Sequence, residues 1–306
     1  MKAIEVLAPA KVNLFLKILN RRNDGFHDIE TVFEKISLFD RIAFREIPRN
    51  TIVFKSNLKG LSAKNNSIYR AASLIKRKFR ISQGLDIYLD KRIPVAAGLG
   101  GGSSDAAYTI QALNGLWKLG LSAKELLNLA SAIGSDAALF MLKESFVLGK
   151  GRGERVFPIK VKDNFKLWHI LIVPKVEVST PRAYSLFDKY YLEKKVAFQG
   201  AILHRKLRLT MPPYSVNIIV RALLSRDVSL LNYYSYNTFE SLILRQFPEL
   251  AGIKRAIEEK TGNFVYLSGS GSALFLTFSN RKGVGGLLGK VRKAAGNCRL
   301  FLVHTL

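Results

Sequence analysis

The sequence predicts an α+β protein built from two domains. The chain has 306 residues, of which 48% are hydrophobic, and this is enough to bury two cores. Runs with strand character are followed by helical runs in both halves, an order typical of α+β folds. No repeat or low-complexity tract interrupts the chain. We place the boundary near Pro158, so the expected domains are residues 1–157 and 158–306.

Hydrophobic periodicity predicts each element in turn. In the first half we expect strands at 4–7, 12–18, 31–38, 40–47, 51–54, 84–91 and 146–148, and helices at 67–79, 104–119 and 122–132. Ser122 stands three residues before Glu125, which is the spacing of a capping box. In the second half we expect strands at 168–173, 264–267, 273–278 and 299–304, a loop entering a helix at 180–191, and helices at 215–225, 229–234, 237–245, 250–260 and 283–295.

Composition excludes several classes of protein. No apolar run is long enough for a membrane span, and the N-terminus lacks the pattern of a signal peptide, so we expect a cytoplasmic protein without membrane contact. The single cysteine, Cys298, excludes an internal disulfide and provides no metal cluster. The net charge of +25 favours anionic ligands. Basic runs such as 76–80 are typical of solvated helix faces, and no zinc-finger or RNP pattern supports a nucleic-acid partner.

The run at 94–107 (PVAAGLGGGSSDAA) is the most informative segment. Glycines leave the backbone free to approach a ligand, and a helix that starts here would point its unpaired amides and positive dipole end at an anion. Ser103 and Ser104 offer an N-cap and hydroxyl donors, and we assign Asp105 to the helix start only. The predicted phosphate-binding residues are Pro94, Gly98, Leu99, Gly100, Gly101, Gly102, Ser103 and Ser104.

Three familiar phosphate motifs do not match this run. A Walker A loop requires lysine where this chain has Ser103. The spacing and position of the glycines do not fit a dinucleotide fingerprint. The His-Arg-Asp and Asp-Phe-Gly motifs of protein kinases are missing from the sequence. The loop must therefore bind phosphate in another way.

Three segments together resemble the signatures of the GHMP small-molecule kinases. They are 8–16 (APAKVNLFL), 94–107 and 267–275 (LSGSGSALF), and they span almost the whole chain. Residues 21–33 (RRNDGFHDIETVF), with 133–136, 151–154, 179–181 and 237–240, are similar to one family of this superfamily. The resemblance implies a ribosomal-S5-like N-terminal domain, a ferredoxin-like C-terminal domain and a site in the cleft between them. It also implies transfer of phosphate from ATP to the 2-hydroxyl of a cytidine-diphosphate-linked methylerythritol, in the non-mevalonate route to isoprenoids.

The resemblance assigns catalytic roles to two residues. Asp136 matches the catalytic aspartate and is predicted to act as the base for the acceptor hydroxyl, although alone it would be read as a helix-cap carboxylate. Lys11 lies in an apolar strand, where burial requires a partner; it either points to water or faces Asp136 and the transferred phosphate. Asn13 shares the strand face of Lys11 and is predicted to support the same pocket.

The resemblance further implies a pocket for the pyrimidine. His27 is predicted to meet the edge of cytosine, because a neutral imidazole both donates and accepts. Phe26, Phe33 and Tyr184 are predicted to wall the base, and Thr180 to contact the same ligand. Magnesium is expected with ATP, and Ser103 or Ser104 with the triphosphate and water can complete its octahedron, but no residue is assigned as a metal ligand. Two alternatives stay open: a related kinase for another alcohol, such as homoserine, and a basic nucleic-acid-binding protein that retains the kinase fold.

Overall fold

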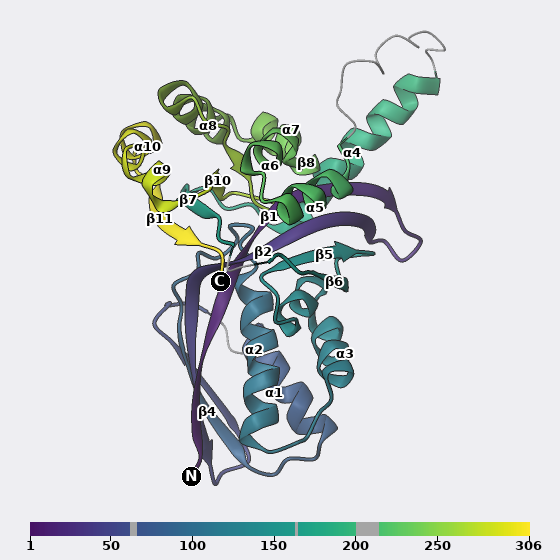
Figure 1. Ribbon diagram of the computed structural model, residues 1–306. Coiled ribbons are helices and arrows are strands. Elements are labelled where there is room, and N and C mark those ends of the chain that lie inside the picture. The colour runs from purple at the N-terminus through teal and green to yellow at the C-terminus, as the bar shows by residue number, and fades with distance from the viewer. Residues whose placement is uncertain (62–65, 163–164, 200–213) are drawn as a thin grey trace.

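The computed structural model describes residues 1–61, 66–162, 165–199 and 214–306. Within them, one sheet contains β1 (Ala3–Arg21), β2 (His27–Ile47), β3 (Ile52–Ser56), β4 (Gly84–Asp90), β5 (Phe146–Lys150), β6 (Arg155–Ile159) and β8 (Tyr236–Asn237). Its order is β3-β4-β2-β1-β8, and β5 pairs with β2 and β6 (Figure 1). The second sheet has the order β11-β7-β10-β9, formed by β7 (Trp168–Val173), β9 (Tyr266–Leu267), β10 (Leu274–Phe278) and β11 (Arg299–His304).

The long antiparallel pair β1–β2 forms the centre of the first sheet. The predicted strands at 4–7 and 12–18 are parts of β1, and those at 31–38 and 40–47 are parts of β2. The expectation of separate strands at 4–7 and 12–18, and at 31–38 and 40–47, is therefore wrong. The register shifts between Pro9 and Ala10, so a bulge accommodates the proline without ending the strand.

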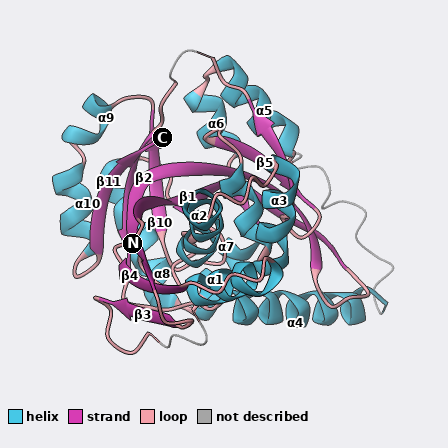
Figure 2. Cartoon of the chain, turned by 90° about the horizontal axis from the view of Figure 1, so that it is seen from below, coloured by secondary structure: helices cyan, strands magenta, loops and turns pink. Residues whose placement is uncertain are grey.

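Helices cover one face of the first sheet. They are α1 (Ser67–Lys78), α2 (Gly101–Leu116), α3 (Ala123–Ile133) and the 3₁₀ helix η1 (Ser135–Met141). Figure 2 shows α2 in the middle of the molecule, where Ala106, Ile110 and Leu113 are buried against the sheet. The capping box of Ser122 and Glu125 is confirmed at the start of α3. Helix α2 begins at Gly101 and not at Ser104, and its N-cap is Gly100, which provides no side-chain cap.

The central strands of the second sheet, β7 and β10, are buried on both faces. Ile170 and Ile172 of β7 face one hydrophobic cluster, whereas Leu171 faces another that is shared with β1. The surrounding helices are α4 (Thr180–Gln199), α5 (Val216–Ser225), α6 (Val228–Tyr234), α7 (Thr238–Gln246), α8 (Pro248–Thr261), α9 (Arg281–Gly285) and α10 (Leu288–Ala295). The helix expected at 283–295 is thus divided in two. No helix in the described part of the chain is long and apolar enough to cross a bilayer.

The two halves of the chain are interlocked. Pro158 lies within β6, opposite Val147 of β5, and Tyr236 of β8 pairs with Phe15 of β1. Between the sheets, fully buried His169 places Nε2 3.0 Å from both carboxylate oxygens of Glu34. Removing either partner would leave a buried polar group unsatisfied. The domain boundary at residue 158 stays a prediction.

Lys35 links β2 to the end of η1. Its buried ammonium donates to the carbonyl oxygens of Leu142 (2.7 Å) and Lys143 (3.3 Å), which directly follow η1. Burial lowers the pKa of Lys35 from an ordinary 10.5 to about 8, and Glu144 acts in the opposite direction. The helix that bears Asp136 is therefore anchored through a side chain that titrates at mildly alkaline pH.

We expect Lys35→Met to lose stability relative to the wild type as pH rises from about 8 towards 10.5. In this window the unfolded chain still holds the Lys35 proton and the folded chain has released it, so rising pH stabilises the folded wild type through this residue. Urea unfolding of both proteins at about pH 7.5 and 9.5 measures the difference. Lys124→Met, at an exposed site, is the control. A difference between Lys35→Met and wild type that does not change with pH would contradict the expectation.

Candidate active site

A cavity of about 1030 Å³ collects segments from both halves of the chain. It lies between the glycine run, the β1–β2 turn, the start of η1, the start of α4 and residues 269–270. The sequence-predicted residues that line it are Lys11, Asn13, Phe26, His27, Phe33, Pro94, Gly98, Leu99, Gly100, Gly101, Gly102, Ser103, Asp136, Thr180 and Tyr184. Ser104 is the exception. The structure thus brings the predicted residues together, while their individual roles stay predictions.

The glycine run has a backbone shape that side chains would prevent. Gly98 has φ +73°, and a Cβ there would lie 2.0 Å from the carbonyl oxygen of Ser268. Gly100 has φ +68°, and a Cβ there would lie 2.8 Å from the side chain of Lys11. The run is also bonded to the C-terminal glycine segment, since Ala273 N donates to Ala97 O at 3.1 Å and Ser268 Oγ to Gly98 O at 3.0 Å. The positive φ angles and the lack of room for a Cβ require glycine at positions 98 and 100.

The amides of this run are available to a ligand. The N–H of Ser104 bonds to Gly100 O at 2.9 Å as the first bond of the helix, whereas no amide from Gly98 to Ser103 donates to another described residue. Unpaired amides at a helix start, together with the positive end of the helix dipole, form an anion site. The geometry therefore suits the phosphates of a nucleotide.

The two serines do not cap the helix as the sequence predicts. Because α2 begins at Gly101, both lie inside its first turn, and Ser104 turns into the core. Its side chain is fully buried, and its Oγ has no hydrogen-bond partner among the described residues. Ser103 lines the cavity and is the hydroxyl that can meet a ligand.

Lys11 forms the polar centre of the cavity. Its buried Nζ donates to Asn13 Oδ1 (2.5 Å) and Gly98 O (3.0 Å), and it lies 3.6 Å from Asp136 Oδ2. Burial lowers the pKa of Lys11, and the Asp136 carboxylate opposes this shift. Asn13 in turn donates to Thr31 Oγ1 at 2.8 Å. The reading in which Lys11 points to water is wrong, because its side chain is only 4% exposed.

Asp136 is placed by the first turn of η1. Its side chain is 32% exposed and lines the cavity, so the carboxylate is paired with Lys11 and still accessible. A Cβ on Gly153 would lie 3.4 Å from Asp136 Oδ1. Next to it, Ala137 and Ala138 are fully buried and anchor the helix in the core. A positioned carboxylate beside a buried ammonium can accept a proton from a bound hydroxyl.

Aromatic side chains form another part of the cavity wall. The ring of His27 stacks on Tyr184 at 4.8 Å, and Phe26, 51% exposed, lies under the guanidinium of Arg152 at 4.7 Å. Phe33 is buried below Lys11, with the Nζ 5.6 Å from its ring centre. Thr180 Oγ1 lies 3.1 Å from Ser270 Oγ. Sequence reasoning missed Arg152 as a partner of Phe26, although Arg152 belongs to the segment 151–154 that carries part of the resemblance.

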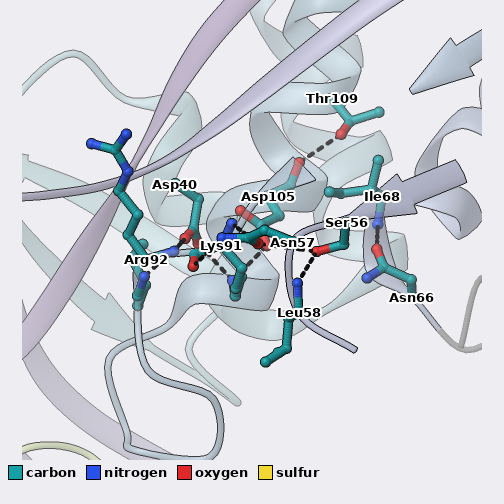
Figure 3. Close-up of polar contacts among 11 residues, drawn as sticks. Asp40, Ser56, Asn57, Leu58, Asn66, Ile68, Lys91, Arg92, Asp105 and Thr109 are labelled. Carbon is teal, nitrogen blue, oxygen red and sulfur yellow. Dashed lines mark hydrogen bonds and ion pairs between the residues drawn. The ribbon is translucent and has the colours of Figure 1, made fainter. Parts of the chain in front are cut away.

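A buried charge cluster lies beneath the glycine run, and it was also missed (Figure 3). Lys91 Nζ lies 2.5 Å from Asp40 Oδ2 and 2.7 Å from Asp105 Oδ2, and a Cβ on Gly101 would lie 2.9 Å from that Nζ. Asp40 Oδ1 accepts from the amides of Arg92 and Ile93. Burial raises the pKa of Asp105 to about 7; Lys91 opposes this shift and Asp40 adds to it. Asp105 is therefore not merely a helix-start residue.

Comparisons with known proteins identify the relatives of this chain. Residues 66–144 match the GHMP kinases N terminal domain. The 4-diphosphocytidyl-2-C-methyl-D-erythritol kinase of Shouchella clausii (strain KSM-K16) is 36% identical over 273 residues, covering 88% of this chain and 84% of that protein. A relative of the same name from Thermodesulfovibrio yellowstonii (strain ATCC 51303 / DSM 11347 / YP87) is 34% identical over 274 residues, with 89% and 88% covered.

The chain belongs to the 4-diphosphocytidyl-2-C-methyl-D-erythritol kinase family. A crystal structure of 4-(cytidine 5'-diphospho)-2C-methyl-D-erythritol kinase superposes on it with a TM-score of 0.74 at 31% identity, covering 98% of this chain and 99% of that one. The homoserine kinase from Cytophaga hutchinsonii also superposes with a TM-score of 0.74, but at 21% identity it shows the fold alone; 99% of this chain and 94% of that one are covered. The α+β GHMP kinase fold expected from the sequence is confirmed.

Two glycine variants test the shape of the glycine run. Gly98→Ala should destabilise the protein by about 2 kcal/mol or more and weaken ATP binding, because the new Cβ collides with a carbonyl oxygen at positive φ. Gly102→Ala is the control for stability alone: its Cβ meets nothing closer than Ser67 Oγ at 3.6 Å, so no collision is expected. Urea unfolding and nucleotide titration report both effects. Equal stability of the two variants would refute the argument.

Proposed function

We propose that this protein transfers the γ-phosphoryl group of ATP to the 2-hydroxyl of 4-diphosphocytidyl-2-C-methyl-D-erythritol. One observation carries the proposal. A single cavity contains free amides at the start of α2, the Lys11–Asp136 pair at its centre, and an aromatic site around His27. These parts correspond to a triphosphate site, a proton acceptor and a site for a planar base.

The chemistry follows from the positions of these groups. The amides of residues 98–103 hold the phosphates of ATP, and the acceptor hydroxyl lies between the γ-phosphorus and Asp136. The hydroxyl oxygen bonds to phosphorus, its proton passes to the Asp136 carboxylate, and the bond to the β-phosphate oxygen breaks to release ADP. Lys11, held by Asn13 and Gly98, stabilises the negative charge on the transferred group. Because these groups are already in place, little reorganisation is needed at the reaction step.

Magnesium is part of this proposal. The described residues contain no group of three or more His, Cys, Asp or Glu side chains that could hold a metal. A hydroxyl with phosphate oxygens and water is a donor set that suits Mg²⁺, and Ser103 would supply the hydroxyl. The ion would neutralise charge on the triphosphate. Ser104 Oγ, buried away from the cavity, is not a candidate ligand.

We further propose a cytoplasmic location and small molecules as the partners. ATP and the cytidyl acceptor account for the cavity, so no specific nucleic acid is needed to explain the net charge of +25. A uniformly basic surface attracts anions without specificity, and such attraction weakens steeply with salt.

Turnover with defined acceptors tests the activity. ADP release should require the cytidyl acceptor, with homoserine giving background rates, since homoserine has no base to occupy the His27 site. A coupled assay measures both substrates under the same conditions. Equal rates with the two acceptors, or none with the cytidyl acceptor, would remove the proposed function.

Asp136 can be tested as the acceptor of the hydroxyl proton. Asp136→Asn should lower kcat by about 10²- to 10⁴-fold, because the amide cannot accept the hydroxyl proton, while the Kd values for ATP and acceptor stay near wild type. Asp86→Asn, whose side chain pairs with Arg45 away from the cavity, is the matched control. Steady-state kinetics with calorimetric binding separates the two effects. A nearly normal kcat for Asp136→Asn would show that another group takes the proton.

A further inference from the structure

Helix α4 encloses the ring of His27 with three side chains. Tyr184 stacks on the ring face at 4.8 Å, Phe187 meets it edge-on at 5.5 Å, and Asp188 Oδ1 lies 2.7 Å from Nε2. Positions 184, 187 and 188 have the i, i+3, i+4 spacing of one helix face. The imidazole is 3% exposed, so it has little freedom to rotate. The ring is therefore oriented before any ligand arrives.

The contact with Asp188 determines which ring nitrogen of His27 carries the proton. An ionised carboxylate only accepts hydrogen bonds, so Nε2 must carry the proton that it donates to Oδ1. No hydrogen bond within the described part of the chain engages Nδ1, and His27 lines the cavity. In the neutral ring, Nδ1 is then an acceptor. The tautomer is set by the bond that the other nitrogen makes.

We propose that Asp188 is a positioning residue that selects cytosine over uracil by holding His27 in the Nε2–H tautomer. The inference rests on the proposed function, in which the base of the acceptor occupies this part of the cavity. Cytosine presents an amino donor at N4, whereas a uracil or thymine ring presents a carbonyl acceptor at the same position. An accepting Nδ1 binds the amino group and faces the lone pairs of the carbonyl. The opposite tautomer would reverse this preference.

The ion pair with Arg21 does not explain where Asp188 is placed. Arg21 Nη1 lies 3.7 Å from Asp188 Oδ2, and the Arg21 side chain is 60% exposed. An exposed ion pair of this length is screened by solvent and contributes little. The short contact is the one to buried His27. Asp188 is thus aimed at the imidazole, and its carboxylate also lines the cavity.

Nitrogen NMR of labelled histidine measures the tautomer directly. The wild type should show His27 protonated at Nε2 only, with the signal assigned by its loss in His27→Gln. Asp188→Asn keeps the shape but has an amide that either accepts or donates, so both tautomers should populate. Asp188→Glu, which keeps an acceptor-only group, should restore the wild-type state. A wild-type ring protonated at Nδ1, or at both nitrogens, would overturn the proposal.

Specificity supplies the second measurement. The ratio of kcat/KM for the cytidyl acceptor over its uridyl analogue should fall about tenfold in Asp188→Asn, the effect of one hydrogen bond, and recover in Asp188→Glu. The change should lie in KM, with kcat for the cytidyl acceptor and KM for ATP unchanged. Lys189→Ala, exposed on the same helix, is the control. A folded Asp188→Asn with the wild-type ratio would also overturn the proposal.

The two measurements separate this inference from the proposed function. If the wild type phosphorylates neither acceptor, the proposed function fails, and the NMR spectra still decide whether Asp188 sets the tautomer. If the wild type discriminates between the bases and Asp188→Asn does so equally well, the function stands and the role of Asp188 falls.

Discussion

The buried ammonium of Lys11 is the interaction on which the site depends. A lysine removed from water must be surrounded by acceptors, and here they come from Asn13 on its own strand, the carbonyl of Gly98, and the carboxylate of Asp136. These groups belong to β1, the glycine run and η1, which are far apart in sequence. Satisfying one charge thus brings three functional segments to one place.

This constraint also explains why the surrounding backbone is rich in glycine. A Cβ at Gly100 would press on the Lys11 side chain, and a Cβ at Gly269 would lie 3.1 Å from its Nζ. The lysine and the two glycine segments are therefore a single packing unit. Nearby, Lys91 pairs with both Asp40 and Asp105 beneath the first turn of α2, so the glycine run rests on a second buried cluster. Polar groups buried in this way fix positions only if their hydrogen-bond partners are in place.

The frame around the cavity is held by contacts between the two halves. Tyr236 and Asn237 add a short strand to β1, and His169 and Glu34 pair in the interior between the sheets. Lys35 links the end of η1 to β2. Helix α4 then brings Tyr184 and Asp188 to His27, which lines the same cavity as the glycine run. The surroundings of His27 are thus built by one half of the chain on a turn provided by the other.

Local pattern determined a large part of this protein. Alternation predicted most strands, the Ser122–Glu125 spacing predicted a helix start, and the two-residue spacing predicted that Lys11 and Asn13 share a face. These features depend on neighbours within a few positions, so the amino-acid sequence alone determines them. Other features depend on the packed structure. The start of α2 at Gly101 and the burial of Ser104 depend on which side of the helix meets the core. The pairing of Lys91 with Asp105 and of His27 with Asp188 joins residues 14 and 161 positions apart. Only the tertiary structure decides them, because burial and pairing are properties of the packed chain.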